Sequence, residues 1–162
     1  MGRLARLAQL TVILAWSFPA VWAADARIRK VLPSLLDREG RASVHPSLYE
    51  RDAYQAHLRS KPALVGGMRF DVHWSAPRQG TTPLELRLEL RGSSAGTNGA
   101  SGIVGTNAVV LNTPVDPPRW GAHWSRITLT EAARTQVGDV TAWRATLLRD
   151  GKAVASSQSF LW

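Results

Sequence analysis

From residue 68 onward the sequence alternates apolar and polar side chains, and this period of two constrains the fold more than any other feature. In residues 83–90, PLELRLEL, leucine occupies every second position, with glutamate or arginine between. RFDVHW follows the same pattern, with Phe70, Val72 and Trp74 at alternate positions. Successive side chains of a β-strand point to opposite faces of the sheet. Both runs therefore predict strands with one face in the core and the other in water.

The rest of the chain adds strands of the same kind, separated by turn-forming residues. NAVVLN and RITLT predict two strands, the second with Ile127 and Leu129 inward. VTAWRATLL predicts a third, in which Trp143, Ala145 and Leu147 alternate with other residues. TEAARTQVGD, which precedes VTAWRATLL, predicts a turn or a single helical turn. The pair Asp150-Gly151 between two strand-like runs is a strong signal for a β-hairpin.

The last predicted strand runs to Trp162, the final residue of the sequence. Phe160 and Trp162 stand two residues apart, so we expect both rings on one face and buried in the core. Ser156 and Gln158 interrupt the alternation, which predicts a bulge or an exposed stretch at that point.

About six antiparallel strands with short connections favour a mainly β fold, because an α/β fold needs helices between its strands. The predicted fold class is a single antiparallel β-sandwich over residues 68–162, preceded by a short N-terminal helical segment. The order of elements in this part, with a long loop, a Trp-bearing strand and a terminal hairpin, resembles immunoglobulin and fibronectin type III sandwiches.

Residues 24–67 are predicted to form a helical or irregular segment. SLYERDAYQAHLR predicts a helix over residues 47–59, which Pro62 prevents from continuing far. Ser47 and Glu50 have the spacing of a capping box. Tyr49, Ala53 and Ala56 recur at helical spacing, which predicts an apolar stripe that packs on the rest of the fold.

Residues 1–23 are typical of a secretory signal peptide. Arg3 and Arg6 precede the apolar run LAQLTVILAWSF, and VWA supplies a cleavage motif that places the cut after Ala23. An uncleaved membrane anchor is the alternative. The signal peptide predicts a secreted or periplasmic protein. With no cysteine in the chain, disulfides and a cysteine-linked lipid anchor are excluded.

Four segments add a second resemblance. VLPSLLDREGR, PSLYERDAYQAHLR, FDVHW and the ending SFLW resemble an uncharacterised family of small secreted bacterial proteins. The resemblance implies no activity. It implies that the N-terminal helix and the sandwich form one unit.

The sequence predicts no catalytic, metal or cofactor site. No two of the four histidines stand at a spacing typical of a metal pair, and no G-x-S-x-G motif occurs. The glycine-rich GTNGASG lacks the Lys-Ser/Thr ending of a phosphate-binding loop. We therefore expect a non-enzymatic protein.

PPRWGAHWSR is the best candidate for a partner-binding surface, because it places two aromatic side chains beside cations. Aromatic faces next to arginine suit sugar rings or extended peptides, and such residues are frequent at interaction hot spots. The alternative, which the sequence favours, is that one or both tryptophans begin a strand and plug the end of the core. The candidate residues are Arg119, Trp120, His123, Trp124 and Arg126.

The net charge of +8 comes from scattered arginines rather than a basic run, so it favours an ordinary solvated surface. The alternative is weak attraction to anionic glycans, lipid head groups or nucleic acid, and no specific nucleic-acid binding is expected. Another envelope protein or a glycan is the expected partner, and an open strand edge is a further possible contact. The overall prediction is an exported binding or accessory module. An outer-membrane or membrane-anchored structural protein is the alternative, since an aromatic last residue is typical of outer-membrane strands. The oligomeric state is left open.

Overall fold

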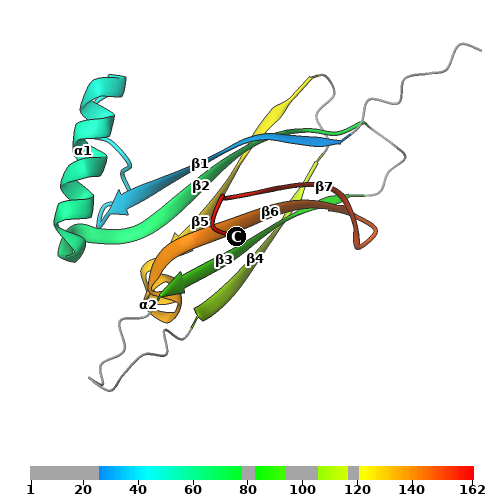
Figure 1. Ribbon diagram of the computed structural model, residues 1–162. Coiled ribbons are helices and arrows are strands. Elements are labelled where there is room, and N and C mark those ends of the chain that lie inside the picture. The colour runs from blue at the N-terminus through cyan, green and yellow to red at the C-terminus, as the bar shows by residue number, and fades with distance from the viewer. Residues whose placement is uncertain (1–25, 78–82, 94–105, 117–120) are drawn as a thin grey trace, which may run out of the picture.

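The computed structural model describes residues 26–77, 83–93, 106–116 and 121–162, which form two antiparallel sheets and two α-helices (Figure 1). The three-stranded sheet has the order β1-β2-β5, with β1 at Arg27–Asp37, β2 at Val65–Ser75 and β5 at His123–Thr130. The four-stranded sheet has the order β4-β3-β6-β7, with β4 at Thr106–Val115, β3 at Leu84–Ser93, β6 at Asp139–Arg149 and β7 at Lys152–Gln158. The mainly β fold class is confirmed.

The core lies between the two sheets, and the alternation in the sequence predicts which side chains enter it. The alternate apolar residues of β2, β3, β5 and β6 all contribute to one buried cluster. The predicted inward residues that are buried are Phe70, Val72, Trp74, Leu84, Leu86, Leu88, Leu90, Ile127, Leu129, Ala145 and Leu147, with Trp143 packed against them. These assignments are confirmed.

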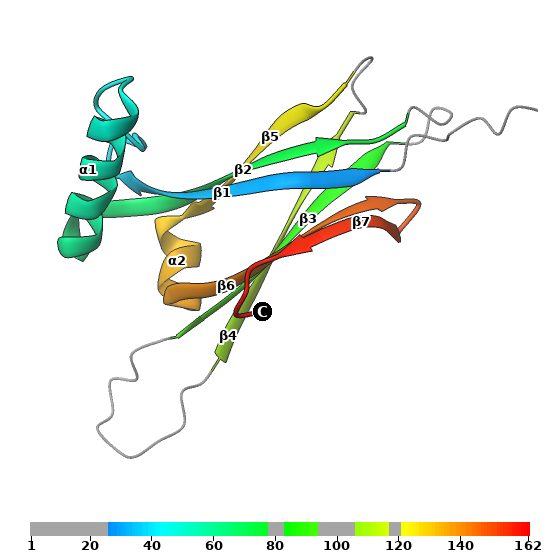
Figure 2. The ribbon, with the colours of Figure 1, turned by 45° about the horizontal axis from the view of Figure 1, so that its top comes forward.

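Two connections in the structure also follow from the sequence. Asp150 and Gly151 both have positive φ, at 50° and 73°, as the two-residue hairpin turn between β6 and β7 requires. TEAARTQVGD contains α2, Glu131–Val137, whose N-cap Thr130 accepts a hydrogen bond from the Ala133 N–H. Figure 2 shows α2 between the two sheets at one end, where its Val137 is fully buried.

The prediction that residues 24–67 are helical or irregular is wrong for residues 27–37, which form β1. This strand pairs antiparallel with β2, where Pro33 lies opposite Phe70. Proline cannot donate to a sheet ladder, but it is tolerated at the edge of a sheet, and β1 is an edge strand. The predicted boundary between residues 67 and 68 consequently falls within β2.

The predicted helix is present as α1, Leu48–Ser60, but it is attached differently from the prediction. Ser47 is the N-cap residue, yet its side chain makes no capping hydrogen bond, and the carboxylate of Glu50 lies 3.9 Å from His45 Nδ1 instead. The predicted apolar stripe is also wrong, because Tyr49 is 84% exposed and the buried residues of the helix are Gln55 and Leu58.

Helix α1, which stands at one end of the three-stranded sheet (Figure 1), is held there by the side-chain amide of Gln55. Its Oε1 accepts from the Leu35 N–H at 2.8 Å, and its Nε2 donates to the carbonyls of Leu35 and Ala42 at 2.9 and 2.8 Å. Leu35 lies on the edge strand β1. The amide therefore takes the place that a neighbouring strand would occupy, and it closes this part of the sheet edge.

The end of the chain departs from the predicted strand. Strand β7 stops at Gln158, and the segment after it turns back toward β6 (Figure 1), where the Ser159 N–H donates to the Trp143 carbonyl at 2.9 Å. Phe160 is fully exposed, so its predicted burial is wrong. Trp162 is partly buried rather than enclosed in the core. Its ring lies against the guanidinium groups of Arg91 and Arg144, whose Cζ atoms are 4.0 and 4.6 Å from the ring centroid.

Ser156 and Gln158 are exposed, as the broken alternation predicts, and the register shift of β7 lies between Ala153 and Ala155.

Candidate functional site

The outer face of the three-stranded sheet gathers charged and aromatic side chains. In β2 the odd-numbered residues 69, 71 and 73 point away from the core, because residues 70, 72 and 74 are buried. The register places Asp71 opposite Arg126 and His73 opposite Trp124 on β5. Two segments more than 50 residues apart in sequence thus meet in one row of side chains.

Trp124 is stacked on His73 and faces solvent. The two ring centroids lie 4.6 Å apart with an angle of 15° between the planes, and the Trp124 side chain remains 47% exposed. The favoured prediction that a tryptophan of this segment plugs the core is therefore wrong for Trp124. Ile127 and Leu129 point inward on β5, so a residue at an even-numbered position must point outward.

Asp71 links the two arginines of this face. Its carboxylate accepts from Arg69 Nε at 2.9 Å and from Arg126 Nε at 3.2 Å. Asp71 and Arg69 are about one-fifth exposed, whereas Arg126 is 65% exposed. The ion pairs hold Arg126 in place beside the row formed by His73 and Trp124, with one carboxylate shared between two guanidinium groups.

A hollow of about 500 Å³ lies beside Trp124, between the end of β4 and the beginning of β5. Thr113 and Asp116 line it from one side, and His123, Trp124 and Arg126 line it from the other. Hydroxyl, carboxylate, imidazole and guanidinium groups thus surround an exposed indole ring. This combination offers an apolar surface for stacking and several hydrogen-bonding groups at its border.

The structure brings together only part of the predicted partner-binding set. His123, Trp124 and Arg126 lie at the start of β5, while Arg119 and Trp120 fall outside the described residues. His123 contacts the core residue Trp74 edge-on at 6.1 Å, so it borders the face rather than standing on it.

Sequence reasoning missed the contribution of β2 to this site. Residues 69, 71 and 73 were recognisable as the outward positions of a strand, since they alternate with Phe70, Val72 and Trp74. Their partners on β5 depend on the pairing register, which the alternation does not specify.

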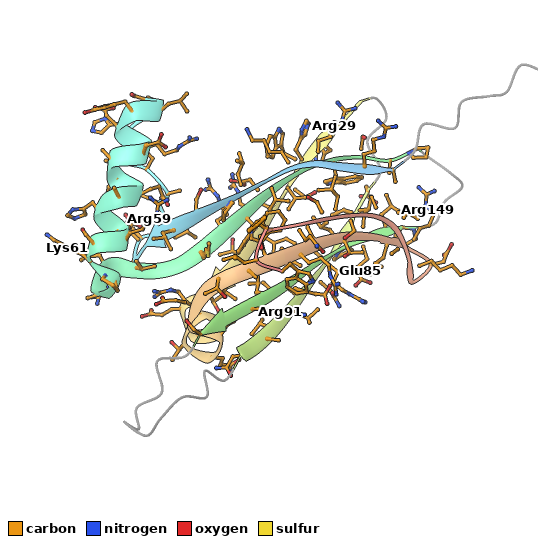
Figure 3. All side chains as sticks on the ribbon, in the orientation of Figure 1. Arg29, Arg59, Lys61, Glu85, Arg91 and Arg149 are labelled. Atoms are coloured by element: carbon orange, nitrogen blue, oxygen red, sulfur yellow. The ribbon has the colours of Figure 1, made fainter. Side chains whose placement is uncertain are left out.

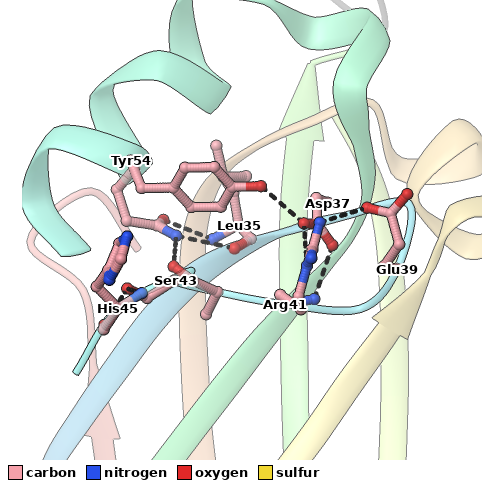
Figure 4. A network of polar contacts seen from close by, with 9 residues as sticks. Leu35, Asp37, Glu39, Arg41, Ser43, His45 and Tyr54 are labelled. Carbon is pink, nitrogen blue, oxygen red and sulfur yellow. Dashed lines mark hydrogen bonds and ion pairs between the residues drawn. The ribbon is translucent and has the colours of Figure 1, made fainter. Parts of the chain in front are cut away.

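The most strongly shifted carboxylate of the described residues belongs to a different cluster, shown in Figure 4. Asp37 is buried, accepts from the Tyr54 hydroxyl at 2.7 Å, and accepts from the Arg41 backbone N–H and Nε, both at 2.8 Å. Burial raises the pKa of Asp37, but the hydrogen bonds from Tyr54 and Arg41 outweigh it and lower the pKa from 3.8 to about 2. This cluster ties α1 and the preceding loop to the end of β1.

Asp37 gives the stability of the protein a dependence on acid pH. Because its pKa is lower in the folded protein, its contribution is complete above about pH 4 and is lost as the pH falls toward 2. Asp37→Asn should lower the free energy of unfolding at pH 7 by about 1–3 kcal/mol, since the Tyr54 hydroxyl and the N–H groups of Arg41 lose their charged, buried acceptor. Urea unfolding at pH 7, 4 and 2 should show a smaller acid-induced loss for the variant than for the wild type. Parallel pH curves of the two proteins would contradict this role.

Within residues 26–77, 83–93, 106–116 and 121–162, no group of three His, Asp or Glu side chains is arranged to hold a metal ion. No helix in those same ranges is long and apolar enough to cross a membrane. Comparisons with protein-family models, curated proteins and solved structures found no match for the chain.

Proposed function

We propose that the protein is a secreted or periplasmic, non-enzymatic binding module of the cell envelope that binds a glycan through the outer face of its three-stranded sheet. The observation that carries the proposal is the solvent-exposed Trp124, stacked on His73 and bordered by Arg126. The export of the protein rests on the signal-peptide pattern of residues 1–23.

The stacking geometry favours a sugar as the ligand. One face of the indole of Trp124 is covered by His73, and the side chain remains 47% exposed beside the hollow, where a flat apolar surface could stack on it. A pyranose ring presents such a surface of C–H groups, with hydroxyl groups at its rim. Asp116, Thr113 and Arg126 line the adjoining hollow and offer partners for those hydroxyls.

The proposed fold is an immunoglobulin-like sandwich, and the strand order supports it. The first, second and fifth strands share one sheet, and the third, sixth and seventh share the other. Immunoglobulin domains divide strands A, B, E and C, F, G in the same way. Strand β4 pairs with β3, whereas constant-type domains place the fourth strand in the first sheet.

Calorimetric titration of the protein without residues 1–23 with a hexamer of N-acetylglucosamine tests the function. Trp124→Ala should weaken binding at least about tenfold, as expected for an aromatic hot spot, and leave the melting temperature unchanged within about 2 °C. Tyr49→Ala is the matched control, because Tyr49 is an exposed aromatic residue on α1 that does not line the hollow beside Trp124. Equal binding by the Trp124 variant and the wild type would contradict the proposal.

A further inference from the structure

We propose that the hollow between α1 and the outer face of the three-stranded sheet binds the acidic group of an anionic glycan. The inference rests on the proposed function and names the class of glycan. It concerns a second place on the same face, lined by Arg69 and Asp71 and lying farther along β2 toward α1 than His73 and Trp124.

The hollow has a volume of about 460 Å³ and is lined mainly by polar side chains. Helix α1 contributes Arg51, Asp52 and Arg59, and β2 contributes Arg69 and Asp71. Figure 3 shows Arg59 between α1 and the strands. Three guanidinium groups therefore share one concave surface with two carboxylates.

Of the three arginines that line the hollow, two form ion pairs with its carboxylates and Arg59 does not. Arg69 pairs with Asp71 at 2.9 Å, and Arg51 lies 3.4 Å from Asp52. Asp71 also pairs with Arg126, so its negative charge is already compensated by two guanidinium groups. Among the described residues, Arg59 has neither an ion pair nor a side-chain hydrogen bond, and it is exposed to solvent.

A free guanidinium group beside a second arginine suits a carboxylate. Arginine presents several N–H donors in a planar fork, which matches the two oxygens of a carboxylate and makes charge-assisted hydrogen bonds. The hollow is closed on one side by α1, whose position is fixed by the buried amide of Gln55. Arg59 is thus held on a fixed element rather than on a loop.

The two places on the face are far enough apart to require an extended ligand. Outward residues of a strand follow one another at about 6.6 Å, so Arg69 and His73 are separated by about 13 Å. A single sugar ring cannot reach from Trp124 to Arg59, whereas an oligosaccharide can. An acidic sugar a few rings away from the stacked one would then place its carboxylate in the hollow.

Two sugars of equal length separate the roles of Arg59 and Trp124. One probe is the neutral hexamer of N-acetylglucosamine, and the other is a hyaluronan hexasaccharide, in which N-acetylglucosamine alternates with glucuronate. Titration calorimetry at 50 mM NaCl should give tighter binding of the hyaluronan fragment by the wild type. That preference should shrink at 200 mM NaCl, because salt screens the charge contribution.

Arg59→Gln should lower the affinity for the hyaluronan fragment about tenfold and leave the affinity for the neutral hexamer within twofold. Arg59→Lys, which keeps the charge but not the fork, should retain part of the preference. Arg87→Gln is the matched control, since Arg87 lies on β3 in the other sheet. Trp124→Ala should weaken both sugars.

The outcomes distinguish the two proposals. If Trp124→Ala weakens both sugars while Arg59→Gln leaves their ratio unchanged, the inference about the hollow is overturned and the proposed function stands. If the wild type binds neither sugar, both are overturned. A preference for hyaluronan that Arg87→Gln abolishes and Arg59→Gln does not would assign the acidic site to the other sheet and overturn the inference.

Discussion

Trp74→Ala should lower the free energy of unfolding by about 3–5 kcal/mol, the range typical of large-to-small aromatic substitutions in a core. The Trp74 side chain is completely buried between the sheets, and its Nε1 donates to Ser125 Oγ at 2.8 Å. The substitution removes the ring from the core and leaves the Ser125 hydroxyl without its donor. Urea unfolding followed by circular dichroism measures the loss.

Trp124→Ala is the matched control for Trp74→Ala, because Trp124 lies near Trp74 in the same sheet but on the outer face. It should change the free energy of unfolding by less than about 1 kcal/mol. Trp74→Phe, which keeps an aromatic ring in the core, provides a measurable protein if Trp74→Ala does not fold. Equal losses for Trp74→Ala and Trp124→Ala would show that the two faces are assigned wrongly.

Gln55→Ala should lower the free energy of unfolding by about 3 kcal/mol, since it removes three hydrogen bonds worth about 1 kcal/mol each. The amide of Gln55 is buried, and its loss leaves the Leu35 N–H and the carbonyls of Leu35 and Ala42 without partners. Hydrogen exchange should also become faster at Leu35. Both changes are expected because the Gln55 side chain makes the hydrogen bonds that a neighbouring strand would otherwise make with β1.

Ala56→Ser is the control for Gln55→Ala, because Ala56 is the next residue of α1 and is exposed. It should leave the stability within about 0.5 kcal/mol of the wild type. If Gln55→Ala behaved like Ala56→Ser in urea and in hydrogen exchange, the helix would have to be attached to the sheet by other contacts.

The alternation of residues was sufficient to predict the core-facing strands. In β2, β3, β5 and β6 one face is buried, so the position of each residue along the strand fixes its side. The same rule, applied from Ile127 and Leu129 back along β5, places Trp124 outside the core. The sequence therefore contained the signal that corrects the assignment of Trp124.

Strand β1 and the attachment of α1 could not be predicted in this way. Pro33 in the middle of β1 argues against a strand, and only its place at the sheet edge makes it tolerable. The docking of α1 depends on a polar residue, Gln55, which hydrophobic periodicity treats as solvent-facing. The turn that exposes Phe160 depends on contacts of Ser159 with Trp143, which lies on another strand.

The sequence predicted which types of residue form the candidate site, but not all of the residues that belong to it. His123, Trp124 and Arg126 were evident as an aromatic and cationic segment, but His73 and Asp71 join them through the β2–β5 register. Arg59 reaches the same face from a helix, through the hollow beside Arg69. Juxtapositions of this kind arise from strand pairing and helix docking, which local sequence patterns do not specify.

The most direct test of the binding face is a nuclear magnetic resonance titration of the tryptophan indole N–H signals with the hyaluronan hexasaccharide. The Trp124 signal, identified by its absence from Trp124→Ala, should shift in proportion to the sugar bound. The Trp74 signal should not shift, since Trp74 is buried on the opposite face of the sheet and its N–H is bonded to Ser125. A Trp124 signal that stays unmoved at saturating sugar, while other tryptophan signals shift, would contradict the account and place the binding site elsewhere.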